Sequence, residues 1–394
     1  MNDSAVPSVR RERSLHLVLD ALKVLGPSSR KALGTHTGLS FSAIASIVRI
    51  LIEAGLVEEE TAIDPSRGRG RPSARLSLRR EESLVAAIDF GHNHIKVALA
   101  RGGLVVAEDD LLLDVDRLPV EAMDAAVAAV GSLLTEIGAE LSDVAAVAAG
   151  VPAPIDKDFN VVAAVNVLPA WIGFNPHDQL VRRLTRPAIV RNDAEMGALG
   201  EMRYANVVEK DFLYLKASHG IGACLVLDGR IYRGYRGAAG ELGHVQLAGQ
   251  DNFCRCGKRG CVEAVLGTGR IAQQLSYVLR DQGGMTGEDA ASIALAAQFP
   301  AGARVLADAG RALGRLLAEV CIILDPAAII IGGNLGAAGD PLLQGTREAI
   351  RRYTGNDAAA DVTVRAAALG CRAELLGAVA IATDASASGY IPAL

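Results

Sequence analysis

The sequence predicts an α/β body preceded by a winged helix-turn-helix domain. From Leu84 onward, short apolar runs of strand length alternate with Ala-rich stretches of helical length, a pattern typical of α/β folds. Before residue 80 the order is three helical segments followed by an alternating, strand-like segment. We therefore expect two domains, residues 1–80 and 84–394, with the boundary near residues 78–83.

Composition and charge support this division. The 394 residues suffice for two or three domains, and half of them are hydrophobic, which excludes global disorder. The overall charge is −5, but residues 1–80 contain 13 Lys and Arg against 8 Asp and Glu, a net of +5, which leaves −10 for the rest of the chain. We expect only the N-terminal part to meet a polyanion.

Nothing in the sequence indicates secretion or a membrane. The segment from Met1 to Arg13 has no apolar core, and the longest apolar stretch, near residues 320–331, is interrupted by an Asp-Pro pair. We therefore expect a cytoplasmic location, no membrane partner and reduced cysteines. Cys224, Cys321 and Cys371 lie in apolar segments and are predicted to be core residues.

Three helices are predicted in the N-terminal domain. The first covers Ser14–Leu25, the second starts at a Ser28 or Ser29 cap and runs to about Thr35, and the third follows a Ser40 cap. The apolar stripe of the third helix comprises Ile44, Ile47, Val48, Leu51 and Ile52.

The residues off this stripe form the predicted DNA-binding face. They are Ser42, Ala43, Ser46 and Arg49, which we expect to enter a major groove. A helix, a turn containing glycine and a second helix are the arrangement of helix-turn-helix proteins. The alternative for the three helices is a structural bundle or a dimerisation unit.

An arginine-rich turn follows the helices. Arg67, Arg69 and Arg71 alternate with glycine, and the strand-like segment 74–78 comes shortly after. Such a hairpin predicts a wing whose tip enters a minor groove or binds phosphates, although a solvated linker would have the same composition. Two copies in a homodimer or homotetramer would read pseudo-palindromic operator DNA.

One histidine and three cysteines follow one another closely, with the spacing of metal ligands. They are His244, Cys254, Cys256 and Cys261. Three thiolates and one imidazole suit tetrahedral Zn²⁺, and four protein ligands leave no open position for catalysis. Gly257 and Gly260 allow the loop to turn tightly. The alternative is a set of free cysteines in a polar loop.

Acidic residues accompany this loop. If zinc fixes it, Glu241, Glu263 and the His244 ring are held near one point, where they could accept hydrogen bonds from a polyol. Asp193 follows a predicted strand at residues 188–191, at the edge where ligands of open α/β sheets gather. It could act as a general base toward a sugar hydroxyl, or it could cap the following helix.

These motifs resemble those of the ROK family (repressor, open reading frame, kinase), in its transcriptional-regulator branch, over nearly the whole chain. The matching segments are 192–194 (Asn-Asp-Ala), 240–244 (Gly-Glu-Leu-Gly-His), 254–263 with the three cysteines, and the Gly-Arg-Gly-Arg-Pro of residues 68–72. The resemblance implies a two-lobed, actin-like sugar-kinase fold for residues 84–394, which would bind an effector and form the oligomer. It implies that the zinc ligands are His244, Cys254, Cys256 and Cys261, and that the residues facing a sugar are Asn192, Asp193, Glu241, His244 and Glu263.

The chain departs from the kinases of this family in both phosphate loops. Their Asp-x-Gly-Gly-Thr reads Asp-Phe-Gly-His-Asn at residues 89–93, and their Gly-Thr-Gly-x-Gly reads Ser-His-Gly-Ile-Gly at residues 218–222. Histidine side chains would crowd the backbone that a phosphate must approach. The turn at residues 332–334, where the kinases seat adenosine, is retained.

Two functions are compatible with these observations. The first is a regulator, most simply a repressor, whose body senses a sugar or sugar phosphate and changes its affinity for operator DNA. The second is an ATP-dependent sugar kinase carrying an added DNA-binding domain. The winged helix and the altered phosphate loops favour a regulator that is not an enzyme, in which Asp193 is a vestige of the kinase base.

Overall fold

The computed structural model describes residues 9–53, 57–61, 74–78, 83–161, 168–282, 287–355 and 361–388. The chain divides into two compact units, Met1–Glu82 and Ser83–Leu394, and the division falls beside the predicted boundary. No single helix in the described ranges is long and apolar enough to cross a membrane, although two sharply bent helix pairs pass that test jointly.

The described residues of the N-terminal unit form three helices and one pair of antiparallel strands. Its elements are α1 (Val9–Leu25), α2 (Arg30–Thr37), α3 (Phe41–Glu53), β1 (Val57–Thr61) and β2 (Ala74–Leu78). The Ser29 side chain caps α2 by accepting from the backbone of Ala32, and Ser40 accepts from Ala43 at the start of α3. Gly38, at φ 70°, supplies the left-handed turn between them. Helices α2 and α3 are bent by 113°, within the range of helix-turn-helix pairs.

The third helix buries most of its predicted stripe. Ile44, Ile47, Val48 and Leu51 are at most 5% exposed, but Ile52, the fifth residue of the stripe, is 36% exposed. At 100° per residue Ile52 lies at the edge of the stripe, in the last turn of the helix. On the opposite side Ser42, Ser46 and Arg49 are exposed, and Ala43 is half-buried on the flank.

Strands β1 and β2 pair antiparallel, with Val57 opposite Leu78 and Thr61 opposite Ala74. Leu76 of β2 is fully buried in the core of this unit, beside the helices. The predicted wing tip, with Arg67, Arg69 and Arg71, lies outside the described residues.

Within the described part of the body, the strands form two five-stranded sheets of the same topology. The first has the order β5-β4-β3-β6-β7 and the second the order β10-β9-β8-β11-β12. In each, the first three strands along the chain are antiparallel and the last two join in parallel. The strands are β3 (Leu84–Phe90), β4 (His94–Arg101), β5 (Leu104–Leu112), β6 (Val144–Val151), β7 (Ala188–Asn192), β8 (Phe212–Ala217), β9 (Ile221–Leu227), β10 (Arg230–Tyr232), β11 (Ala328–Gly332) and β12 (Thr363–Ala366).

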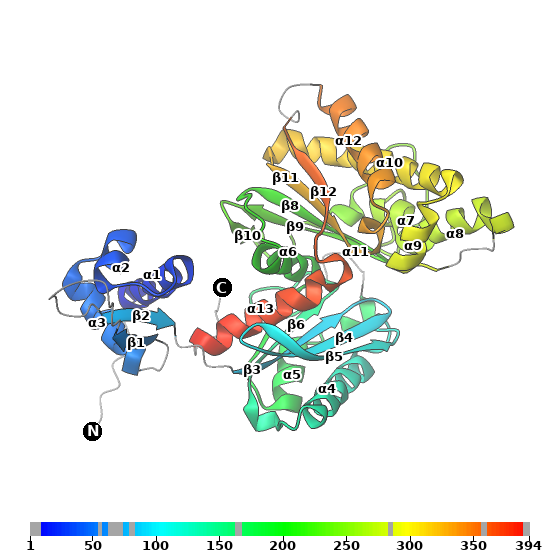
Figure 1. The fold of residues 1–394 in the computed structure, drawn as a ribbon. Helices are drawn as coiled ribbons and strands as arrows, with labels where there is room; N and C mark the ends of the chain where they lie inside the picture. The colour runs from blue at the N-terminus through cyan, green and yellow to red at the C-terminus, as the bar shows by residue number, and fades with distance from the viewer. Residues whose placement is uncertain are drawn as a thin grey trace. The chain divides into compact units, whose positions relative to one another are not determined.

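Helices cover both sheets (Figure 1). They are α4 (Pro119–Glu136), α5 (Pro176–Leu184), α6 (Asp193–Tyr204), α7 (Val262–Leu266), α8 (Thr268–Val278), α9 (Ala290–Ala296), α10 (Pro300–Leu324), α11 (Gly333–Gly336), α12 (Asp340–Thr354) and α13 (Ala373–Ser388). We call β3–β7 with α4 and α5 the first lobe, and β8–β12 with α7–α12 the second lobe. Each lobe has its own apolar core, so the predicted two-lobed α/β body is confirmed.

Helices α6 and α13 lie between the two sheets, packed against each other (Figure 1). Their contact depends on glycine. A Cβ at Gly377 would lie 1.8 Å from the carbonyl oxygen of Met196, and one at Gly200 would lie 2.1 Å from that of Ala373. The backbones therefore approach more closely than any side chain permits.

Candidate functional site

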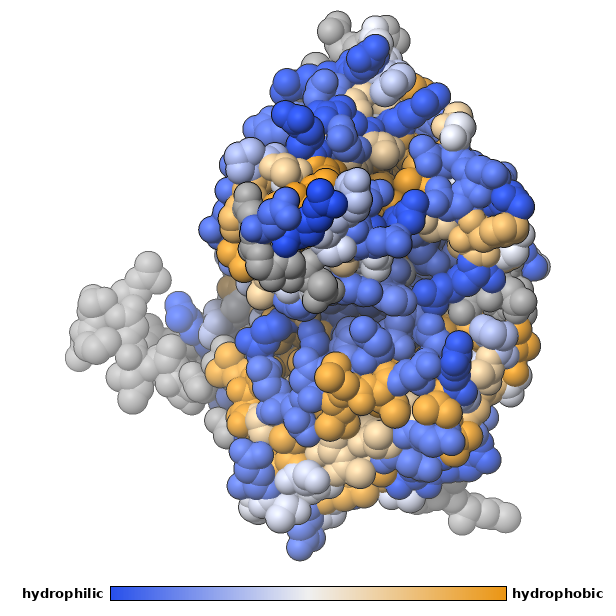
Figure 2. All heavy atoms as spheres, turned by 90° about the vertical axis from the view of Figure 1, so that its right-hand side faces the viewer, coloured by the Kyte–Doolittle hydropathy of each residue, from blue (hydrophilic) through white to orange (hydrophobic). Residues whose placement is uncertain are grey.

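A cavity of about 410 Å³ lies between the two lobes. Figure 2 shows a hollow crossing the body, with mainly hydrophilic residues around it. Residues at or just beyond the C-terminal ends of several strands line the cavity: Gly91, Pro152, Asn192, Ser218 and Asn334. This is where open α/β sheets bind ligands, because parallel strands end there and the chain leaves for the next helix.

All five residues expected to face a sugar line this one cavity. Asn192 ends β7 and Asp193 begins α6, whereas Glu241 and His244 come from the turn before the cysteine loop, and Glu263 from α7. The two lobes thus contribute opposite walls. Carboxylates accept hydrogen bonds, and hydroxyl groups of a polyol donate them.

The four predicted metal ligands form one cluster. Their donor atoms, one from each of His244, Cys254, Cys256 and Cys261, all lie within 4.8 Å of one another. The sulfurs of Cys256 and Cys261 are 3.6 Å apart, and Nδ1 of His244 is 3.6 Å from the Cys254 sulfur. A tetrahedron with metal–sulfur bonds of about 2.3 Å has edges of about 3.7 Å. The cluster could therefore hold a metal ion.

Glycines shape the cysteine loop. Gly257 has a φ of 88° and Gly260 a φ of 71°, so both adopt the left-handed conformation that the sequence predicted for this turn. The backbone N–H of Cys254 donates to the carbonyl of Lys258, and that of Gly260 donates to Asn252. These bonds hold the cysteines of the loop close together.

His244 connects the cluster with the cavity. Its Nδ1 faces the Cys254 sulfur, while its Nε2 lies 3.9 Å from a carboxylate oxygen of Glu241. One ring nitrogen is thus directed at the metal cluster and the other at the cavity, the arrangement in which one histidine can serve both. Burial, together with the charges of Asp193 and Glu263, raises the pKa of Glu241 to about 7.

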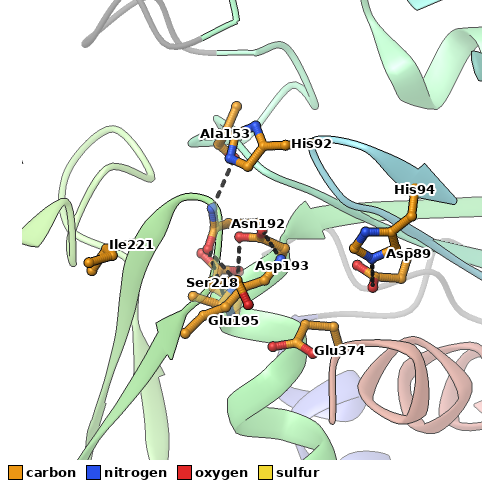
Figure 3. Close-up of polar contacts among 12 residues, drawn as sticks. Asp89, His92, His94, Ala153, Asn192, Asp193, Glu195, Ser218, Ile221 and Glu374 are labelled. Carbon is orange, nitrogen blue, oxygen red and sulfur yellow. Dashed lines mark hydrogen bonds and ion pairs between the residues drawn. The ribbon is translucent and has the colours of Figure 1, made fainter. Parts of the chain in front are cut away.

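The N-cap residue of helix α6 is Asn192 and not Asp193 (Figure 3). The Asn192 Oδ1 accepts from the backbone of Ala194 at 2.9 Å and of Glu195 at 3.3 Å, and its Nδ2 donates to the carbonyl of Ala153. Oδ1 of Asp193 also accepts from Ala194, at 2.7 Å. The first N–H groups of α6 are therefore satisfied by its own side chains.

The second oxygen of Asp193 belongs to an ion pair that sequence reasoning missed. Lys216, in β8, donates to Oδ2 of Asp193 at 2.5 Å, and both residues are buried. Burial lowers the pKa of Lys216, but the charges of Asp193, Asp89 and Glu374 outweigh it and raise that pKa above its ordinary value. The one signal in the sequence was a lysine inside an otherwise apolar strand.

Histidine rings cover both altered phosphate loops. A Cβ at Gly91 would lie 2.2 Å from the ring of His94, and one at Gly220 would lie 2.4 Å from Nε2 of His92. The rings of His92 and His219 are 5.6 Å apart. The crowding predicted from the sequence is therefore present at both loops. Figure 3 shows His94 directed at Asp89, which lies at the end of β3.

A polar network joins the cysteine loop to the first lobe. Arg255, between two of the cysteines, donates to Asp116 at 2.8 Å and lies 3.3 Å from Glu263. His92 bonds the other oxygen of Asp116 at 2.6 Å. Although burial opposes ionisation of Asp116, its bonds to His92 and Arg255 hold its pKa below the ordinary value. Sequence reasoning missed this network because its members come from distant parts of the chain.

One further expectation needs correction, and one cavity residue was not predicted. Cys371, predicted to be a core residue, is only half-buried, lines the cavity and donates from its thiol to Asn334. Thr268, which no motif singled out, also lines the cavity. Its hydroxyl is buried and has no hydrogen-bond partner among the described residues, so a ligand hydroxyl could satisfy it.

Comparison with known proteins agrees with this architecture. A glucokinase of Halalkalibacterium halodurans is 33% identical over 60% of this chain and 75% of its own length. The DNA-binding transcriptional repressor Mlc of Escherichia coli is 26% identical over 83% of this chain and 82% of its own. The crystal structure of a ROK family transcriptional regulator, described as a homologue of the E. coli MLC protein, matches with a TM-score of 0.78 and 25% identity, over 96% of this chain and 98% of that one.

The sequence of the body matches one protein family over most of its length. This is the ROK family, and the match covers residues 85–385, from the start of β3 nearly to the end of α13. This range includes both lobes, the cavity and the cysteine loop. The chain belongs to the ROK family.

Proposed function

We propose that this protein is a transcriptional repressor that binds operator DNA through its N-terminal unit and senses a sugar in the cavity of its body. Similarity to a repressor and to a transcriptional regulator over most of the chain supports this assignment. So does the α2–α3 geometry, with Ser42, Ser46 and Arg49 exposed for a major groove. Arg67, Arg69 and Arg71 would bind phosphates beside it.

The observation that carries the choice of a regulator over a kinase is the ion pair between Lys216 and Asp193. Asp193 matches the base of the ROK kinases, and a general base must be free to accept the sugar proton. Here Lys216 occupies one carboxylate oxygen and the backbone of Ala194 the other. The histidine rings packed against Gly91 and Gly220 would also hinder nucleotide binding at the same end of the cavity.

The metal in this proposal is Zn²⁺, held by His244, Cys254, Cys256 and Cys261. Three thiolates and one imidazole favour zinc over magnesium or calcium, which prefer oxygen ligands. The ion would stabilise the loop and would leave Nε2 of His244 for the sugar. Asn192, Asp193, Glu241 and Glu263 would supply the other contacts.

Sugar binding would change operator affinity by favouring one conformation. A ligand that shifts the repressor from 99% operator-competent to 1% must bind the other state about 10⁴-fold more tightly. Helices α6 and α13 pack tightly against each other between the two sheets. A change in how far the two lobes close would therefore alter this contact.

A gel-shift assay on the DNA upstream of the protein's own coding sequence, repeated with a panel of sugars, tests the proposal. We expect a specific complex that one sugar dissolves or strengthens. A parallel assay with ATP and the same sugars should show no phosphorylation. Absence of any specific complex would contradict the regulator, and sugar-dependent turnover of ATP would favour the kinase.

A further inference from the structure

One lysine and three histidines lie at the end of the cavity beside the altered phosphate loops. Each of the four is paired with a carboxylate. Lys216 pairs with Asp193 at 2.5 Å and His92 with Asp116 at 2.6 Å. The other two pairs are His219 with Glu288 at 3.2 Å and His94 with Asp89 at 3.7 Å.

The remaining basic side chains around the cavity are engaged as well. Lys96 donates to the carbonyl of Cys371 at 2.8 Å and lies opposite Asp110 in the β4–β5 pairing. Arg255 is shared between Asp116 and Glu263. Among the described residues around the cavity, each basic side chain thus has a polar partner already in place.

The balance of charge on the cavity wall is negative. Six carboxylates and two lysines line it. The carboxylates belong to Asp110, Asp193, Glu241, Glu263, Glu288 and Asp289. The first N–H groups of α6, which would otherwise attract an anion, are bonded to Asn192 and Asp193. An anionic group entering the cavity would meet this negative charge, and the lysine and arginine side chains around the cavity are already hydrogen-bonded to other groups of the protein.

We propose that the effector is an uncharged sugar and that the cavity excludes the phosphate ester of the same sugar. Many sites that bind phosphate present Arg or Lys side chains free to form charge-assisted hydrogen bonds. This cavity presents acceptor carboxylates and the unpartnered hydroxyl of Thr268, which suit neutral hydroxyl groups. The inference rests on the proposed function, because it selects among the sugars that the repressor would sense.

Calorimetric titration of the full-length protein with matched pairs tests this inference. The pairs are D-glucose and glucose 6-phosphate, D-xylose and xylose 5-phosphate, and N-acetylglucosamine and its 6-phosphate. We expect at least one free sugar to bind, and its ester to bind at least about tenfold more weakly. An ester that binds as tightly as its sugar would overturn the inference and leave sugar sensing intact. Failure of all six compounds would contradict sugar sensing itself, and the inference with it.

A pair of variants tests the physical cause. Asp116→Asn removes the negative charge that pairs with Arg255 and with the ring of His92, so the preference for the free sugar should narrow by about threefold or more. Asp114→Asn makes the same change of charge two residues away, at an exposed carboxylate whose partner is Arg117, and should leave the preference unchanged. Equal narrowing in both variants, or none in Asp116→Asn, would contradict the role of the paired carboxylates.

Discussion

The ammonium group of Lys216 lies 2.5 Å from Oδ2 of Asp193, joining strand β8 of the second lobe to the first residue of α6. Both side chains are buried, and Asp89 and Glu374 lie close enough to raise the pKa of Lys216 as well. A lysine thus supplies positive charge beside Asp193, and the pair ties the second lobe to the start of α6. If Asp193 corresponds to the base of the ROK kinases, as we propose, this pair would hinder proton transfer to it.

Replacing Lys216 with Ala should destabilise the body strongly. The substitution leaves Asp193 buried without its counter-charge, and removing one partner of a buried pair typically costs about 3–5 kcal/mol. The free energy of unfolding, measured in urea, should fall by an amount in that range. Lys210→Ala is the matched control, because Lys210 is exposed, and its effect should stay within about 0.5 kcal/mol. A loss no larger than that of the control would show that the pair contributes little.

Replacing Cys256 with Ser should release the bound metal. A structural zinc site depends on all four ligands, and its binding energy stabilises the fold. We expect about one zinc ion per chain in the wild-type protein by elemental analysis, and much less in the variant, with a lower melting temperature. Cys371→Ser, outside the cluster, should retain the metal. Wild-type protein purified without chelators and free of metal would contradict the site.

Replacing Arg69 or Arg71 with Ala should weaken binding to operator DNA and to unrelated DNA by similar factors. Each lost phosphate contact should reduce the slope of log affinity against log salt by about 0.9. Fluorescence anisotropy at several salt concentrations measures both quantities. Arg236→Ala removes an exposed arginine from the body and should change neither. Unaltered affinity and slope in both wing variants would assign these arginines to a linker.

Replacing Glu241 with Gln should abolish the response to sugar while preserving operator binding. Glu241 lines the cavity and lies beside His244, but it belongs to a different unit from the predicted DNA-binding face. A gel shift with the active sugar should show a response reduced at least about tenfold. Glu319→Gln, on the exposed side of α10, should respond as the wild type does. A normal response in Glu241→Gln would remove this carboxylate from the sugar site.

Replacing Gly377 with Ala should disturb the junction between the lobes. The new Cβ would lie 1.8 Å from the carbonyl oxygen of Met196, which is backbone and can move only with helix α6. Overpacking of this kind costs about 1–3 kcal/mol. Gly131→Ala, in the exposed part of α4 with no atom within 4 Å of the new Cβ, should instead raise the melting temperature, because alanine favours helix. Equal melting temperatures for the two variants would argue against a tight junction.

The sequence was most informative where structure is local. The four ligands of the metal cluster all lie between His244 and Cys261, and two glycines at positive φ close the loop, so spacing was sufficient to predict the cluster. The same holds for the Ser29 and Ser40 caps and the Gly38 turn, whose bonds join near neighbours in the chain. The exposure of Ile52 was not predicted, because the burial of a residue at the edge of an apolar stripe depends on the elements packed beside the helix.

Composition, periodicity and short spacing were thus enough to predict the two-part organisation, the α/β class and a cluster of one histidine and three cysteines that could hold a metal. The common topology of the two sheets could not be predicted in this way, because many different apolar residues satisfy one pattern of strands and the sequence contains no detectable repeat. It became visible only in the folded chain. The tertiary structure also decided the partners of the cavity's charges. Lys216 meets Asp193 from another strand, and Arg255 meets Asp116 from a distant part of the chain, and such contacts exist only once both lobes have folded.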